Sequence, residues 1–285
     1  FEESRIDRSL NSYERTTNTE NVEAYSMNLD FIKQLNPQSK IFYGVEIVQN
    51  DVTSTGLIKD ISTGSETEGP SRYPYSTWNS FAFYLNQETR VTENFTLQQG
   101  LRYNYYKLDA EFDTRFYPFP FTEANLGSGA LTGSLGAVYR PASSWIISAN
   151  FGTAFRSPNV DDVGKVFDSE PGSVTVPNPN LEAEYAYNAD LGLAKVFGNT
   201  IKLDLTGYYT ILKNALVRRD FQLNGQDSIM YDGVMSQVQA IQNAAVAHVY
   251  GLQAGIEIQL PSGFSISSDL NYQLGEEELD DGTTS

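Results

Sequence analysis

The feature that most constrains this chain is a strict alternation of apolar and polar residues that recurs in segment after segment. Between residues 201 and 211 one parity is apolar or aromatic: Ile201, Leu203, Leu205, Tyr209 and Ile211. The other parity is mostly polar: Lys202, Asp204, Thr206, Tyr208 and Thr210. Because successive side chains of a β-strand point to opposite faces, this period of two predicts strands with one apolar and one polar face. The same alternation recurs over 250–260 and 264–274.

The alternation predicts ten strands, which are joined by short and long connections in turn. The strands are expected at Glu23–Lys33, Lys40–Asn50, Thr77–Arg90, Asn94–Phe112, Ala130–Arg140, Ser144–Phe155, Ala183–Phe197, Thr200–Asn214, Ala247–Leu260 and Gly263–Glu276. The polar segment up to Asn21 is expected to be a loop with part of a preceding strand. Tight turns are predicted at 36–39, 92–93, 141–143, 198–199 and 261–262, and long connections at 51–76, 113–129, 156–182 and 215–246.

The fourth long connection is predicted to contain a hairpin of its own. The segments 216–223 and 228–231 flank Asn224-Gly225-Gln226-Asp227, which is a strong turn signal. We expect these two segments to pair with each other as a strand pair standing above the main sheet.

Two environments could accept such strands. In a soluble β-sandwich the apolar face packs on a second sheet, whereas in an outer-membrane barrel it faces lipid and the polar face lines a hydrated lumen. Short turns alternating with long loops, and 18 Tyr and 16 Phe residues, favour the barrel. No run approaches the roughly 18 apolar residues of a spanning helix. The expected fold is therefore an all-β, antiparallel transmembrane β-barrel, of which this chain supplies about 10–12 strands.

Composition excludes several functional classes. A net charge of −17 argues against a DNA or RNA partner, because phosphate binding needs a basic surface. The absence of Cys removes disulfides and thiolate metal sites, and a single His restricts acid–base catalysis. We therefore expect no enzymatic activity, no cofactor and no metal site.

Two short motifs mark the ends of the third long connection. The first is Phe155-Arg156-Ser157-Pro158, and the second is Asn178-Pro179-Asn180-Leu181. Together with Tyr208-Tyr209, Asn214-Ala215, Gln242-Asn243 and Tyr250-Gly251, they resemble the barrel domain of TonB-dependent outer-membrane receptors, particularly the haemoglobin, haem and siderophore group. The resemblance covers roughly the last half of the chain. Independently of it, Pro158 and Pro179 are expected to end β-ladders, since each lacks an N–H group.

The resemblance implies a barrel of about 22 strands that is closed by an N-terminal plug and energised through TonB. The chain begins at Phe1 without an initiator Met and ends in a polar stretch, so residues 1–285 are interpreted as a fragment of the barrel domain without the plug. Its expected location is the cell outer membrane, and its expected partners are membrane lipid, the TonB complex through the missing plug, and a small iron chelate or haem-type ligand.

Ligand capture is expected to fall to the long loops. The candidate residues are Arg156, Arg218, Arg219, Tyr231, Phe116, Tyr117 and Phe119. Arginines would suit an anionic ferric chelate and aromatic side chains a planar apolar ligand. Arg156 has two interpretations, as a ligand contact or as an anchor that ties its loop to the rim.

Haem is a doubtful ligand on sequence grounds. Receptors of the resembling group commonly carry an axial His between the two motifs, whereas this chain has no His, Tyr or Met between Pro158 and Asn178. Its one histidine, His248, is interpreted as a rim residue. Two alternatives to active uptake stay open: a passive porin or surface adhesin with the same wall, and a soluble β-sandwich binding module.

Overall fold

The computed structural model describes residues 2–10, 13–117, 119–165, 167–170, 172–198, 200–231, 233–260 and 263–278. Within these residues the fold is almost entirely β. The long strands are β1 (Glu2–Leu10), β2 (Glu14–Asn36), β3 (Ser39–Asp60), β5 (Tyr75–Arg90), β6 (Phe95–Glu111), β7 (Glu123–Tyr139), β8 (Trp145–Arg156), β11 (Glu184–Phe197), β12 (Ile201–Asp220), β14 (Val234–Gln259) and β15 (Ser265–Glu278). The predicted all-β, antiparallel wall of about 10–12 strands is confirmed.

The remaining elements are short and lie within the long connections. They are β4 (Glu66–Gly69), α1 (Val160–Gly164), β9 (Phe167–Glu170), β10 (Ser173–Thr175) and β13 (Ser228–Tyr231). No helix among the described residues is long and apolar enough to cross a membrane.

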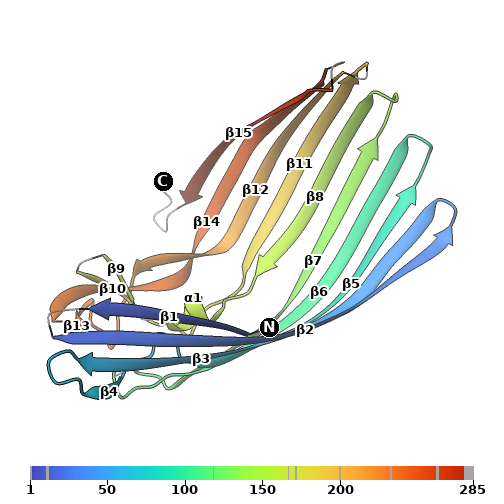
Figure 1. The fold of residues 1–285 in the computed structure, drawn as a ribbon. Helices are drawn as coiled ribbons and strands as arrows, with labels where there is room; N and C mark the ends of the chain where they lie inside the picture. The colour runs from blue at the N-terminus through green and yellow to red at the C-terminus, as the bar shows by residue number, and fades with distance from the viewer. Residues whose placement is uncertain are drawn as a thin grey trace.

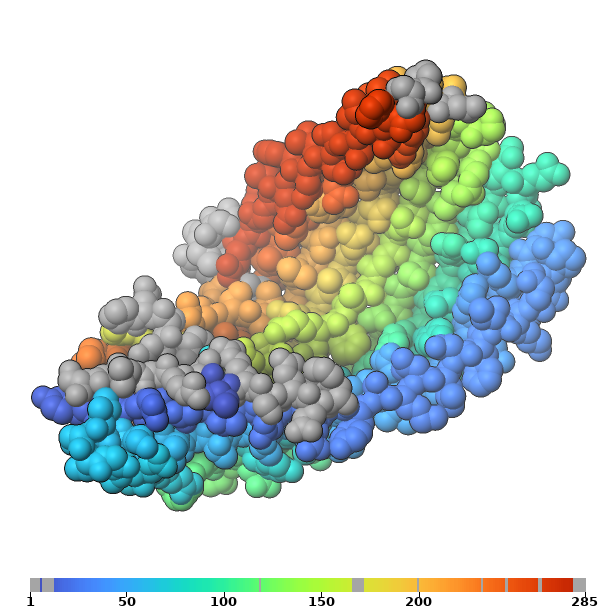
Figure 2. Space-filling view, viewed as in Figure 1, coloured from blue at the N-terminus to red at the C-terminus, as the bar shows by residue number. Residues whose placement is uncertain are grey.

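All strands belong to one sheet that curls into an open trough (Figures 1 and 2). The long strands follow one another in chain order, each antiparallel to the next, from β1 at one edge to β15 beside β14. The short turns lie together at one end of the trough, and the long connections with α1 lie at the other (Figure 1). We call these the turn end and the loop end. Strand–turn–strand succession without crossovers is the topology of an up-and-down barrel wall.

The outer face of the wall carries a continuous belt of exposed apolar side chains. Cross-strand pairs such as Phe83–Tyr103 and Leu85–Leu101 continue this belt from strand to strand. Leu101 is 60% exposed and Leu191 is 69% exposed. The described residues form a single sheet, so no second sheet covers this belt. A sandwich would bury these side chains under a second sheet, so the arrangement of the described residues does not fit one.

The two faces of a strand exchange character along its length, as β6 shows. Toward the turn end its outer face carries Leu101 and Tyr103, and its inner face carries Arg102. Toward the loop end the outer face becomes charged, with Lys107 and Asp109 joined at 2.6 Å, while the inner face carries four buried residues: Tyr106, Leu108, Ala110 and, just beyond the strand, Phe112. The exchange is expected where a strand leaves hydrocarbon and its inner face becomes covered by protein.

Several predicted boundaries and one pairing were wrong. The segment before Asn21 contains the expected part of a preceding strand, β1, but 14–22 were wrongly predicted as a loop, because they pair with β3. The hairpin partners were also wrong: 216–220 pair with β14, and β13 pairs with the start of β14. The turn at Asn224-Gly225 was correct, since both residues have positive φ (53° and 74°) and Leu223 bridges to Gln226. Asn199, Pro261 and Ser262, predicted in turns, lie outside the described residues.

Candidate functional site

The connection between β8 and β11 folds back over the inner face at the loop end (Figure 1). Two buried apolar clusters hold it there. The first joins inner-face residues of β6 and β7 to the connection and comprises Leu108, Ala110, Phe112, Ala124, Leu126, Val163 and Leu181. The second joins β10 to β14 and comprises Val174, Val176, Leu223, Val238 and Ala240. Apolar burial therefore packs this connection against the wall rather than leaving it as a free loop. We call the described residues of this connection, within 157–183, the cap.

The first motif builds the start of this cap. Pro158 is fully buried after the end of β8, and Asn159 caps α1. The Asn159 side chain accepts hydrogen bonds from the backbone N–H groups of Asp161 (2.8 Å) and Asp162 (3.1 Å), while the Asp162 carboxylate accepts from the Asn159 N–H (3.0 Å). This reciprocal capping box explains why the chain forms one helical turn here.

Arg156 ties that helical turn to the wall. Its Nη2 donates to both carboxylate oxygens of Asp162, at 2.6 and 2.7 Å, and its Nη1 donates to Glu184 Oε2 at 3.3 Å. Burial opposes the charge, but Asp162 and Glu184 raise the pKa of Arg156 above its usual value. The guanidinium thus spans α1 and the first residue of β11, which is the geometry of an anchor.

Tyr73 and Lys165 contact the same helical turn through Asp161. Tyr73 Oη donates to Asp161 Oδ1 at 2.8 Å, and Lys165 Nζ lies 3.2 Å from the same carboxylate oxygen. Burial, followed by the hydrogen bond to Asp161, raises the pKa of Tyr73. The β4–β5 connection and the cap are therefore joined through one carboxylate.

The second motif fastens the end of the cap. Asn178 is buried, and its Nδ2 donates to the Ile241 carbonyl of β14 at 2.8 Å. Its Oδ1 accepts from the Asn180 N–H at 3.1 Å, and its own N–H donates to the Val163 carbonyl at 3.0 Å. Leu181 is 3% exposed within the first apolar cluster. The motif therefore joins the cap to both α1 and β14.

Between the motifs, β10 adds to the wall as a parallel strand. Residues 173–175 pair with 237–239 of β14, and Ser173 Oγ donates to Gln239 Oε1 at 2.9 Å. Since β15 pairs with β14 over 246–259, the cap continues the sheet beyond the loop end of β15.

Beneath α1 the inner face forms a chamber of about 520 Å³. Its wall contains an ion pair, Arg102 Nη2 to Glu46 Oε1 at 2.7 Å, and Arg102 also donates to Asn104 at 3.2 Å. Trp78 lines the same chamber, and its Nε1 is buried without a hydrogen-bond partner among the described residues. Arg156 and Asn159 lie at the chamber's cap side. The candidate residues predicted from the sequence did not include Trp78, Arg102 or Glu46, although the alternation places all three on the inner face of their strands.

The predicted aromatic candidates come together only in part. Tyr117 packs on Phe119 (5.7 Å between ring centroids) and on Tyr231 (6.3 Å). Phe119 also stacks on Phe121 at 5.6 Å, within the aromatic group that covers the first apolar cluster. Phe116 lies apart from this stack, under the Arg115 guanidinium. Much of the aromatic surface is therefore occupied by other rings of the chain.

The two remaining candidates, Arg218 and Arg219, are neighbours on β12 but differ in their contacts. Arg219 Nη2 donates to Glu277 Oε1 of β15 at 2.8 Å, whereas Arg218 is exposed on β12. His248 lies in β14 opposite Ile211, and its Nδ1 is 2.7 Å from the Tyr209 hydroxyl on the outer face. His248 thus lies away from the cap, in agreement with its interpretation as a rim residue.

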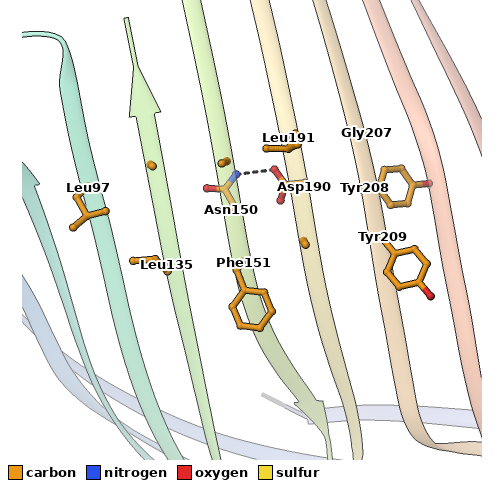
Figure 3. Close-up of a pocket in the computed structure, with 12 residues that line it drawn as sticks. Leu97, Leu135, Asn150, Phe151, Asp190, Leu191, Gly207, Tyr208 and Tyr209 are labelled. Carbon is orange, nitrogen blue, oxygen red and sulfur yellow. Dashed lines mark hydrogen bonds between the residues drawn. The ribbon is translucent and has the colours of Figure 1, made fainter.

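A groove larger than the chamber lies on the outer face. It measures about 680 Å³, with a floor of small residues and walls formed by Leu135, Phe151, Leu191 and Tyr209 (Figure 3). The hydrogen bond from Asn150 to Asp190 (2.7 Å) joins the inner-face side chains of the strands behind it. Its apolar lining and outward position distinguish it from a polar ligand site.

Comparison with known proteins gives the same architecture. The chain is 27% identical over 234 residues to haemoglobin-haptoglobin utilization protein B of Neisseria meningitidis, a match covering 75% of this chain and 28% of that protein. The solved copper transporter OprC matches with a TM-score of 0.73 at 16% identity, covering 92% of this chain and 38% of OprC. The Serratia marcescens hemophore receptor HasR, solved with HasA and heme, matches with a TM-score of 0.72 at 16% identity, covering 97% and 45%.

The chain spans less than half the length of each of these proteins. The structural matches show the shared fold, in which one curled antiparallel wall carries long connections at one end. The family model of the TonB dependent receptor-like β-barrel, a family of transport receptors, matches residues 2–285. The chain therefore belongs to the TonB-dependent receptor-like β-barrel family.

Proposed function

We propose that this chain forms part of the wall of an outer-membrane receptor that takes up a scarce iron chelate with energy delivered through TonB. The observation that carries the proposal is the pairing of two surfaces on one sheet. The outer face is an uncovered apolar belt, and the inner face is a polar chamber under a fastened cap. Lipid outside and a hydrated ligand path inside would use both surfaces.

In this proposal the turn end faces the periplasm and the loop end faces the cell exterior. Outer-membrane barrels have short periplasmic turns and longer extracellular loops. A plug supplied by other parts of the full-length receptor would contact the inner face and connect it to TonB. Because the family consists of transport receptors, we propose that the chain acts in transport and not as an enzyme.

The chamber supports an oxygen-rich chelate as the ligand. Among the described residues Arg102 donates to Glu46 and Asn104 through Nη2 alone, so its Nε and Nη1 groups remain as donors for an anionic ligand. These groups favour an anionic ferric siderophore. A haem-type ligand is the second candidate, because two of the similar proteins are named for haemoglobin-haptoglobin or for a hemophore with heme. It would need an axial ligand, and His248 lies on the outer face.

Uptake by the full-length receptor tests the proposal. A strain that depends on this receptor for iron should accumulate a radiolabelled ferric chelate, and a proton uncoupler should abolish that uptake. Arg102→Gln should weaken chelate binding about tenfold, whereas Lys107→Gln, on the outer face of the same strand, should leave it unchanged. Uptake that persists after uncoupling would instead identify a passive porin, and binding without uptake would identify an adhesin.

A further inference from the structure

Lys195 is a cation on the outer face near the turn end, where its neighbours are apolar and aromatic side chains. It lies on β11 opposite Trp145 of β8 and Leu203 of β12, and this cross-strand row continues through Ile256 of β14. Its Nζ lies 4.2 Å from the Trp145 ring centroid and 4.7 Å from that of Phe197. The aliphatic stem is half-buried beside these rings, so the ammonium group is held at a fixed height near the turn end.

Among the described residues no carboxylate forms an ion pair with Lys195, whereas Lys202 on the next strand lies 3.5 Å from Asp204. Lys202 faces the inner side, because it pairs with Val196 rather than with an outer-face residue. Lys195 and Lys202 lie within one residue of each other along neighbouring strands but differ in environment. In the described part of the chain, Lys202 contacts the Asp204 carboxylate, whereas Lys195 contacts the aromatic rings of Trp145 and Phe197.

An apolar groove of about 520 Å³ begins beside this lysine. Its lining includes Trp145, Lys195 and Phe197 at one end, and it runs over β12 to Leu270 of β15. Most of the other lining residues are apolar, among them Leu193, Leu205 and Ile256; the polar ones are Ser268 and Asp204, and Asp204 alternates with the outer-face residues Leu203 and Leu205. A groove with one cation at its mouth and aliphatic walls matches a molecule with an anionic head and a hydrocarbon tail.

We propose that Lys195, Trp145 and Phe197 bind the phosphate of an anionic membrane phospholipid whose acyl chain lies in this groove. This site rests on the proposed placement of the outer face in lipid. The turn end would then lie in the periplasmic leaflet, where the rings occupy the interfacial layer and the ammonium donates to the phosphate. The cation–π contacts hold the ammonium beside the aromatic faces and leave N–H donors available for the lipid.

The test uses the full-length receptor in phosphatidylcholine vesicles that contain equal fractions of either brominated phosphatidylglycerol or brominated phosphatidylcholine. Bromine quenches the fluorescence of Trp145, which is isolated by subtracting the emission of the matched Trp145→Phe protein. We expect an affinity about fivefold higher for phosphatidylglycerol, since one lysine near an anionic lipid contributes about 1 kcal/mol. Lys195→Gln should remove this preference, and Lys195→Arg should keep it.

Lys202→Gln is the matched control, and it should retain the full preference. Heat-modifiable migration in a gel verifies that each variant is folded before it is measured. Equal quenching by the two lipids in the unaltered protein, or an unchanged preference in Lys195→Gln, would overturn the lipid site while leaving the receptor proposal intact. Absence of quenching by either lipid in the folded protein would overturn the placement of this face in lipid, and with it the receptor proposal.

Discussion

Arg156 Nη2 lies within hydrogen-bonding distance of both carboxylate oxygens of Asp162, at 2.6 and 2.7 Å. The side chain of Asp162 is 11% exposed, and the same carboxylate completes the capping box of α1. Asp162 thus completes the capping box of α1 and also accepts the hydrogen bonds of Arg156, which connects α1 to the wall. This coupling makes the cap sensitive to a single substitution.

Arg156→Ala should loosen the cap without unfolding the wall. The half-exposed guanidinium limits the loss to about 1 kcal/mol, or roughly a fivefold higher rate of limited proteolysis within 157–183. Arg218→Ala is the control, because Arg218 is exposed and lies outside the cap. Loss of chelate binding with an unchanged proteolysis rate would show that Arg156 contacts ligand instead.

Asn178→Ala should free the other end of the cap. The substitution leaves the Ile241 carbonyl and the Asn180 N–H without their side-chain partner in a buried site, at a cost of about 1–3 kcal/mol. Hydrogen exchange in the peptides covering 173–183 should accelerate accordingly. Asn180→Ala changes an exposed neighbour and should have little effect; similar exchange in both variants would contradict the role given to Asn178.

Leu191→Arg should impair assembly of the barrel. Leu191 is 69% exposed on the outer face, four residues farther from the turn end than Lys195, and an arginine near the middle of the bilayer costs about 2–4 kcal/mol. The folded fraction, measured by heat-modifiable migration, should fall. Thr206→Arg places the same charge on the inner face of the neighbouring strand β12 and should be tolerated better. Equal assembly of the two variants would argue against lipid at Leu191.

The turn after β3 should resist acid. The Asp60 carboxylate accepts hydrogen bonds from Ser62 Oγ (2.6 Å) and from the backbone N–H groups of Thr63 and Ser62 (2.8 Å each). These bonds lower the pKa of Asp60 to about 2. Because the pKa is lower in the folded turn, its stabilisation is complete above pH 4 and is lost as the pH falls through about 2. Pepsin cleavage within 60–66, relative to Asp60→Asn, should rise over that interval.

The sequence predicted β5, β6, β8 and β11 to within two residues at the loop end, but it missed the loop-end parts of β2, β3, β7, β12 and β14. Alternation identifies a strand most clearly while its outer face is apolar, as at Leu101 and Tyr103. Above that level the faces exchange character, so β3 continues to Asp60 and β12 to Asp220 although the predicted strands ended earlier. The polar residues at 16–21 lost their strand signal for the same reason.

The site was harder to predict than the wall because its residues come from distant segments. Arg156, Pro158, Asn178 and Leu181 were found as motifs, and packing explains why these types occur there. Trp78, Arg102 and Glu46 gave no signal beyond their place on the inner face, since only the curvature of the sheet brings them into one chamber. The predicted hairpin pairing was wrong for a similar reason. A turn at Asn224-Gly225 fixes where the chain reverses direction, but not which strand pairs with the segments on either side of it.

The exchange of faces along β6 also sets the vertical position of the whole receptor in the proposed membrane. Sinking by one pair of residues, about 7 Å, would draw Lys107 and Asp109 into the hydrocarbon, and rising by as much would lift Tyr105 into water. Both displacements are unfavourable, so the wall would keep a defined depth in the proposed membrane. The cap of the proposed receptor would then stay at a constant height above the lipid, on the side from which its ligands arrive.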